Sequence, residues 1–184
     1  MRRMNDEKLM EKAQEGDFGA FATIVERHKE KLMAFAASYV RWDLDQAQEI
    51  LQAAFVQAFE KRLSFDCARP LAPWLFGVVR NSALRWIRQK RNQVPLENVE
   101  TILVSLDSPE EEAIRLQRAF HVSKMVGRLP RTQREVVTLI RQGFRHGEVA
   151  VILGITEVSA RNNLCHALKT LRAEAEKGRT ADGL

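Results

Sequence analysis

Cysteine is scarce in this sequence, and its two cysteines stand far apart. Cys67 and Cys165 form neither a CxxC nor a CxxH spacing, which argues against a structural zinc site and against the disulfide framework of a small secreted protein. No apolar run approaches the roughly 18 residues of a membrane-spanning helix, and the first residues, MRRMNDEKLMEKAQEGD, lack the apolar stretch of a signal peptide. We therefore expect a reduced, cytoplasmic protein that does not associate with a membrane.

Catalytic motifs are missing as well. The four histidines are scattered, and the sequence contains no H-E-x-x-H, no G-x-S-x-G and no phosphate-binding loop. These absences argue against an enzyme such as a nuclease or a deaminase, and we expect neither a metal nor a cofactor. The net charge of +5 instead suits a partner that is rich in phosphate.

Strand signals are absent too, because the sequence has no Asn-Gly hairpin turn and no alternating β-branched segment. Apolar residues recur at helical spacing instead. In the amino-terminal half this spacing predicts four helices that could share one core, at about 6–15, 18–41, 44–62 and 74–90. His28 is expected to be a satisfied histidine in this core or at its boundary.

Residues 92–107, NQVPLENVETILVSLD, differ from the rest because they contain no Lys or Arg and show no convincing period. The following Ser108-Pro109-Glu110-Glu111 provides an N-cap serine, a first-turn proline and a glutamate, which predict a helix to about Gly127. The predicted fold is therefore all-α, with two small helical domains joined by an extended acidic linker. In this organisation a domain covers 1–91, the linker 92–107, a second domain 108–175, and a disordered tail 176–184.

The stretch EVAVILGITEVSARNNLCHALKTL, residues 148–171, is an apolar helical run that stops at Gly154 and restarts within three residues. Glycine suits the left-handed position that ends a helix, and Thr156 suits the N-cap of the next one. A short helix, a glycine turn and a second helix are typical of a DNA-binding helix-turn-helix. Upstream, Thr132 and Glu135 are predicted to form a capping box.

The second helix of this unit carries apolar and polar residues on two different faces. Its inner side is predicted to contain Ala160, Leu164, Ala167, Leu168 and Leu171. Its outer side contains Ser159, Asn162, His166 and Lys169, flanked by Arg161 and Asn163. Asparagine can read adenine edges, and Arg or Lys can take guanine or phosphate. The alternative is a helical hairpin whose polar face only meets water, but five nearby arginines favour DNA: Arg128, Arg131, Arg134, Arg141 and Arg145.

A second basic helix is predicted in PWLFGVVRNSALRWIRQKRN, residues 73–92. Five basic residues and no acid occur between Arg80 and Arg91, which is typical of a face that follows a phosphate backbone. Three aromatic residues, Phe65, Trp74 and Phe76, are candidates for exposed rings that stack on unpaired bases. The alternative is a solvated basic helix whose aromatics all belong to the core, and for Trp86 we favour the core.

These motifs together resemble the extracytoplasmic-function sigma factors, the minimal two-domain sigma factors of bacterial RNA polymerase. The resemblance covers nearly the whole chain and rests on the order of the motifs. They are AQEILQAAF (47–55), WLFGVVRN (74–81), SPEE (108–111), LPRTQREV (129–136) and the helix-turn-helix. The resemblance implies a subunit that binds core RNA polymerase and promoter DNA, recognises two promoter elements and opens the duplex. It also implies control by an anti-sigma factor or another regulator.

The resemblance implies roles for three sets of residues. The set that docks on polymerase is Asp43, Asp45, Gln48, Glu49 and Gln52. The set that recognises and melts the −10 element is Phe65, Trp74, Asn81, Arg85, Arg88 and Arg91, together with the loop from Ser64 to Pro73. The set that reads the −35 element is Ser159, Arg161, Asn162, Asn163, His166 and Lys169. The acidic linker would thread the nucleic-acid channel of the polymerase.

The sequence departs from the family pattern at three places. Gln48 stands where the family has an acid, Arg85 replaces another acid, and Arg161-Asn162-Asn163 replaces a common lysine, small residue and arginine. The first departure weakens the docking assignment, and the other two suggest an uncommon promoter. Two rival functions are a sigma-like decoy that binds an anti-sigma factor but not DNA, and a one-component helix-turn-helix repressor. The intact basic and recognition helices argue against the decoy, and the repressor leaves WLFGVVRN unexplained.

Overall fold

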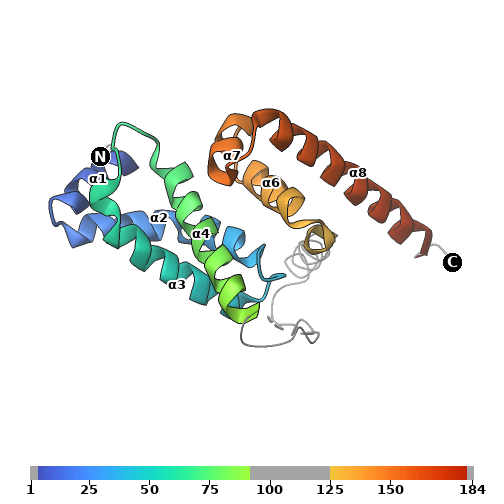
Figure 1. Cartoon of the computed structure of the whole chain (residues 1–184), viewed down its shortest axis with the longest axis horizontal. Coiled ribbons are helices and arrows are strands. Elements are labelled where there is room, and N and C mark those ends of the chain that lie inside the picture. Colours follow the sequence, from blue (N-terminus) through green and yellow to red (C-terminus); the bar gives the residue numbers. More distant parts are fainter. Residues whose placement is uncertain (1–3, 92–124, 182–184) are drawn as a thin grey trace, which may run out of the picture.

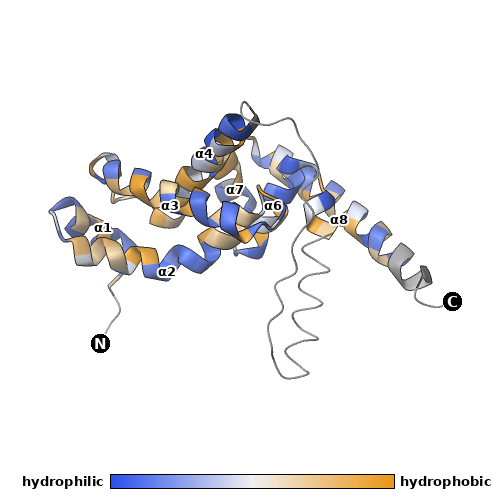
Figure 2. Cartoon of the chain, turned by 90° about the horizontal axis from the view of Figure 1, so that it is seen from below, coloured by the Kyte–Doolittle hydropathy of each residue, from blue (hydrophilic) through white to orange (hydrophobic). Residues whose placement is uncertain are grey.

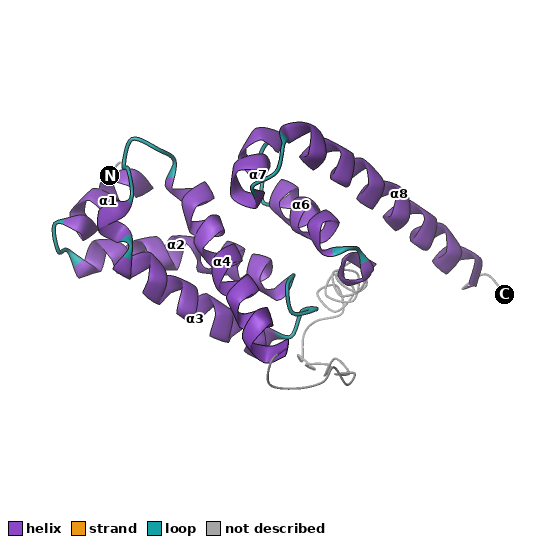
Figure 3. Cartoon of the chain, viewed as in Figure 1, coloured by secondary structure: helices purple, strands orange, loops and turns teal. Residues whose placement is uncertain are grey.

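The chain folds into helices in a computed structural model that describes residues 4–91 and 125–181 (Figures 1 and 3). The amino-terminal part contains α1 (Asp6–Gln14), α2 (Phe18–Ala37), α3 (Leu44–Glu60), the short 3₁₀ helix η1 (Arg62–Ser64) and α4 (Leu71–Arg91). The carboxy-terminal part contains α6 (Arg131–Arg141), α7 (His146–Leu153) and α8 (Glu157–Ala181). No strand occurs in these two ranges, and the all-α class is confirmed. The predicted linker and the predicted helix up to residue 124 lie outside the described residues.

Three amino-terminal helices begin at acceptor side chains, which supply partners for otherwise unpaired backbone N–H groups. Asn5, Asp17 and Asp43 each accept a backbone N–H from three residues further along, at 3.0 Å. The end of α2 was predicted near residue 41 but lies at Ala37. The chain turns there because Arg41 and Trp42 adopt positive φ angles of 53° and 70°.

The amino-terminal helices enclose a core built from one apolar stripe on each helix. Met10, Ile24, Phe35, Ile50 and Leu75, from α1 to α4, are all essentially inaccessible to solvent. His28 lies at the edge of this core, and its Nε2 is 2.7 Å from Oδ2 of Asp6. The prediction that His28 is a satisfied boundary histidine is confirmed.

The carboxy-terminal helices pack on one another and also on the amino-terminal part. Helices α6 and α7 both pack against α8, while α4 contacts α7 and α2 contacts α6. Figure 1 shows α7 beside α4, and Figure 2 shows apolar and polar residues alternating along the helices. As a result, buried residues of the two parts, such as Phe76 and Val149, belong to one continuous apolar cluster.

One local prediction is wrong. The N-cap of α6 is Pro130 and it makes no side-chain hydrogen bond, while Glu135, the supposed capping carboxylate, is only 2% exposed and lies at the domain contact. The predicted tail starts at residue 176, and α8 continues to Ala181, while residues 182–184 lie outside the described residues. None of the helices in the described ranges combines the length and the apolar character that are needed to cross a bilayer.

Candidate nucleic-acid and polymerase interface

The predicted helix-turn-helix is present, and local residues account for its geometry. Gly154 ends α7 with φ 63° and ψ 38°, a left-handed conformation that costs little without a Cβ. Ile155 donates its N–H to the carbonyl of Ala150 at 3.1 Å, which closes the turn. The hydroxyl of Thr156 then accepts the N–H of Ser159 at 3.1 Å and caps α8, as predicted.

The outer face of α8 presents four of the six predicted −35 residues to solvent: Arg161, Asn162, His166 and Lys169. Arg161 forms an ion pair with Glu157, with Nη2 and Oε1 at 3.2 Å. Ser159 and Asn163 are half-buried, and the amide of Asn163 donates to the carbonyl of Ser159 at 2.8 Å. Asn163 is therefore bound to its own helix and has less freedom to reach a base than Asn162.

Sequence reasoning misjudged two apolar residues of this helix. Leu168 was predicted on the inner side, but it is 41% exposed because the contacts with α6 and α7 are made by Ala160, Leu164 and Ala167. Val158 was not considered, yet it is 65% exposed beside the polar face. Its position three residues before Arg161 and four before Asn162 could have revealed it, because residues at that spacing share a helix face.

Helix α4 presents Asn81, Arg85 and Arg88 to solvent on one face. No acidic partner of Arg85 or Arg88 is found among the described residues, so their charges are available to an external anion. Arg80 behaves differently, because it is half-buried and its Nε lies 4.0 Å from Oε2 of Glu135. Arg91 ends the helix, and its side chain lies outside the described residues.

The predicted stacking platform of exposed aromatic rings is wrong for two of its three members. Phe65 is only 7% exposed and packs on Trp74 with ring centroids 5.0 Å apart, while the amide of Gln14 donates to the Phe65 carbonyl at 2.9 Å. Phe76 is 1% exposed and packs against Phe35. Trp74 alone remains half-buried. Trp86, expected in the core, is also only half-buried.

The predicted polymerase-docking residues lie at the start and middle of α3. Asp45, Gln48 and Gln52 are exposed. Asp43 is engaged as the N-cap, where its carboxylate accepts from both the backbone and the side chain of Gln46. Glu49 accepts a hydrogen bond from Nε1 of Trp86 at 3.0 Å, which ties α3 to α4.

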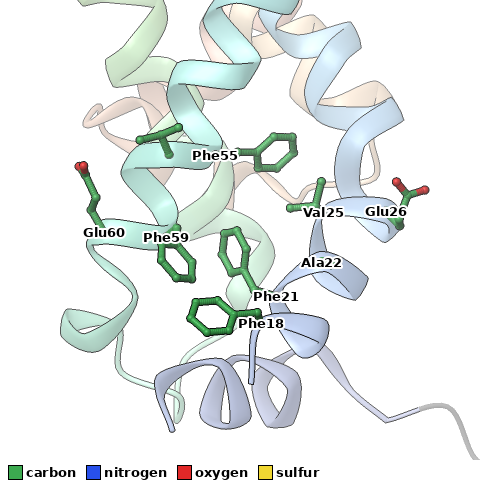
Figure 4. A pocket seen from close by; sticks show the side chains of 9 residues that line it. Phe18, Phe21, Ala22, Val25, Glu26, Phe55, Phe59 and Glu60 are labelled. Atoms are coloured by element: carbon green, nitrogen blue, oxygen red, sulfur yellow. The ribbon is translucent and has the colours of Figure 1, made fainter. Parts of the chain in front are cut away.

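An apolar groove continues this surface toward the end of α3 (Figure 4). Figure 4 shows the rings of Phe18 and Phe21 on α2 directed toward Phe59 on α3. Phe18 stacks on Phe59 with centroids 5.7 Å apart but remains largely exposed, as does Val56. Val56 lies four residues after Gln52 and thus on the same helix face. Exposed apolar patches of this kind mark contact sites for other proteins.

No three His, Cys, Asp or Glu side chains lie close enough to hold a metal ion in the parts of the chain that the structure describes. The arrangement consists instead of two basic, exposed helix faces on separate domains and a mixed acidic and apolar surface on α3.

Comparison with known proteins shows the family to which this chain belongs. Residues 24–93 match the model of sigma-70 region 2, and residues 119–171 match the model of sigma-70 region 4. The RNA polymerase sigma factor NccH of Alcaligenes xylosoxydans is 30% identical over 175 residues, which cover 91% of this chain and 93% of NccH. The chain is a sigma factor of the extracytoplasmic-function family.

Other relatives agree with this assignment. The ECF RNA polymerase sigma-E factor of Escherichia coli K12 is 23% identical over 92% of this chain and 93% of its own length. The chain spans 40% of the probable RNA polymerase sigma factor RfaY of Xanthomonas campestris, at 27% identity. The structure of CnrH in complex with the cytosolic domain of CnrY superposes with a TM-score of 0.71 at 26% identity, covering 94% of this sigma factor and 97% of CnrH. This sigma factor is accordingly a transcription initiation factor of RNA polymerase.

Proposed function

We propose that this sigma factor divides promoter recognition between its two domains. Residues 1–91 bind core polymerase and melt the −10 element, residues 92–107 link the domains, and residues 108–175 read the −35 element. The observation that carries the proposal is the pair of exposed basic faces, α4 with Arg85 and Arg88 and α8 with Arg161 and Lys169. A decoy that binds only an anti-sigma factor has no use for two such faces.

The −35 element is read by the exposed residues of α8. The amide of Asn162 can pair with an adenine edge in the major groove, and Arg161 can pair with guanine. Arg161 must first leave Glu157, but an exposed ion pair of this kind contributes only about 0–1 kcal/mol. Lys169 and His166 lie further along the helix, where contacts to phosphate fix orientation rather than sequence.

Helix α4 and the loop that precedes it bind the −10 element. Arg85 and Arg88 follow the phosphates, and Asn81 offers an amide to a base edge. Because Phe65 is buried, the half-buried Trp74 is the ring that remains for stacking on an unpaired base. Phe65 supports Trp74 from below, since their ring centroids are 5.0 Å apart.

Polymerase docks on the exposed face of α3, with Asp45, Gln48 and Gln52 at one end and Val56 at the other. Asp43 and Glu49 act mainly by holding α3 in place, because both carboxylates are already hydrogen-bonded within the protein. The related CnrH is seen in complex with CnrY. We propose that this sigma factor also has a protein regulator, an anti-sigma factor that covers the apolar groove around Phe18.

Run-off transcription with core polymerase tests the proposal. Asn81→Ala and Arg88→Ala are expected to impair transcription from duplex promoters more than from templates with a pre-opened −10 region, because extruding a base costs a few kcal/mol that the protein must supply. Lys169→Ala is expected to weaken promoter binding evenly across sequences and to lower its salt dependence. Equal defects of the α4 variants on both templates would contradict a melting role.

A further inference from the structure

The segment that joins α3 to α4 is attached to α1 at its start (Figure 1). Gln14, the last residue of α1, donates from its side-chain amide to the carbonyl of Arg62 at 2.7 Å and to that of Phe65 at 2.9 Å. Its amide oxygen accepts from Sγ of Cys67 at 3.5 Å. A glutamine amide has two donor hydrogens, so Gln14 uses its full donor capacity on this segment.

The same segment is attached to α1 at its end. The carboxylate of Glu7 accepts the backbone N–H of Leu71 at 3.1 Å. Leu71 begins α4, where backbone N–H groups have no partner within the helix and a negative charge is favourable. Glu7 and Gln14 lie two turns apart, on one face of α1 and about 10 Å from each other along its axis. One face of α1 therefore holds both ends of the segment.

Helix α1 is itself well fixed, so it can serve as a support. Asp6 at its start pairs with Arg27 and His28 of α2, both at 2.7 Å. At its end, the carbonyl of Ala13 accepts from Nε of Arg62 at 3.1 Å. These contacts tie α1 to α2 on one side and to η1 on the other.

The tip of the loop, by contrast, is held by local bonds. Oδ1 of Asp66 accepts the N–H of Ala68 at 3.0 Å, and its carbonyl accepts the N–H of Arg69 at 3.0 Å. All three residues are exposed. These bonds fix the shape of the turn but not its direction relative to α4. The direction depends on the attachments to α1 and on the packing of Phe65 against Trp74.

We propose that Gln14 and Glu7 are positioning residues for the −10 element. They set the direction of the loop from Ser64 to Pro73, and through Phe65 they set the position of Trp74, while they themselves face the loop. This inference rests on the proposed function of the loop and α4. A loop without this support adopts the binding-competent form only part of the time, and the apparent affinity for unpaired bases falls by that fraction.

Hydrogen exchange on the free, full-length chain tests the attachment. We expect Gln14→Ala to raise the exchange of amides in residues 62–73 by about tenfold, as the loss of one or two hydrogen bonds implies. Glu15→Ala is the control, because Glu15 is its neighbour, has a side chain of the same length and is exposed. Glu7→Ala is expected to deprotect the amide of Leu71, whereas Glu7→Gln keeps an accepting oxygen and should leave it protected.

Selection of DNA by the holoenzyme tests the consequence for recognition. Core polymerase with each variant is presented with a pool of single-stranded oligonucleotides of random sequence, and the bound sequences are counted. Gln14→Ala and Glu7→Ala are expected to weaken binding about tenfold and to flatten the base preference, while Glu7→Gln retains both. Preference within a duplex pool randomised over the −35 region should stay unchanged, since α8 is not altered.

Each outcome bears on one step. Unchanged exchange in Gln14→Ala and Glu7→Ala would overturn the attachment. Faster exchange with an unchanged base preference would overturn the positioning role, as would an equal loss of binding to both pools. If circular dichroism shows that Gln14→Ala is not folded, Glu7→Ala against Glu7→Gln decides. An unmodified holoenzyme without base preference on single strands would instead count against the proposed function, and the exchange result would still stand.

Discussion

Phe65 provides a direct test between contact with DNA and support of the fold. Its ring is 7% exposed and packs on Trp74, and its carbonyl accepts from Gln14. Truncating a fully buried phenylalanine costs about 3–5 kcal/mol. Phe65 lies at the edge of the core in a loop, where neighbours can partly fill the space, so we expect Phe65→Ala to lower the free energy of unfolding by about 3 kcal/mol.

The assay is urea unfolding followed by circular dichroism, with Leu63→Ala as the matched control. Leu63 lies in the same segment but is exposed, and such surface substitutions usually change stability by less than about 0.5 kcal/mol. Phe65→Ala is also expected to impair transcription from duplex and pre-opened templates alike, because it displaces Trp74 in both. A stable Phe65→Ala protein with a defect confined to duplex templates would refute this reasoning and return Phe65 to the DNA-contacting set.

Three further predictions concern other surfaces. Asn162→Ala should cost about 1–3 kcal/mol at particular −35 base pairs, measured by binding to a library of single-base promoter variants; unchanged selectivity would show that α8 reads DNA through other residues. Gln48→Glu should strengthen binding to core polymerase in a competition assay at low salt, where surface charge is least screened. An unchanged affinity would show that Gln48 is not part of the polymerase-binding surface. Burial raises the pKa of Asp6, but hydrogen bonds from Arg27 and His28 outweigh it and hold the pKa below its ordinary 3.8. This carboxylate therefore stabilises the fold above about pH 4, and the stability gap to Asp6→Asn should close as the pH falls through the lowered pKa; a gap independent of pH would contradict this.

The sequence predicts well those features that depend on neighbouring residues. The left-handed Gly154 and the Thr156 cap need only a few positions of chain, and both are present as predicted. Periodicity likewise identifies the apolar stripes of the amino-terminal helices. Features that depend on distant residues were missed. Phe65 is buried because it contacts Trp74 and α1. These contacts lie outside its immediate sequence neighbourhood, so no local pattern predicts them.

The domain contact could not be predicted for the same reason. Glu135 has the spacing of a capping residue, but its partner Arg80 is on another domain, and tertiary packing decided its position. Neither Arg41 nor Trp42 is a glycine or an asparagine, the residue types that usually indicate a left-handed turn. The residues assigned to polymerase and DNA remain predictions, because the fold shows which of them are exposed but not what they bind.

The hydrogen bond between Trp86 and Glu49 has a consequence for how transcription is started. It braces α3, the helix proposed to dock on polymerase, against α4, the helix proposed to bind DNA. If polymerase and DNA bind as proposed, the angle at which the enzyme holds α3 also sets the angle at which α4 meets the promoter. In the proposed function, the carboxylate of Glu49 would then serve to align the two helices more than to attract polymerase. A shorter acid there would keep the charge and lose the reach, leaving a sigma factor that binds its enzyme normally and aims at DNA poorly.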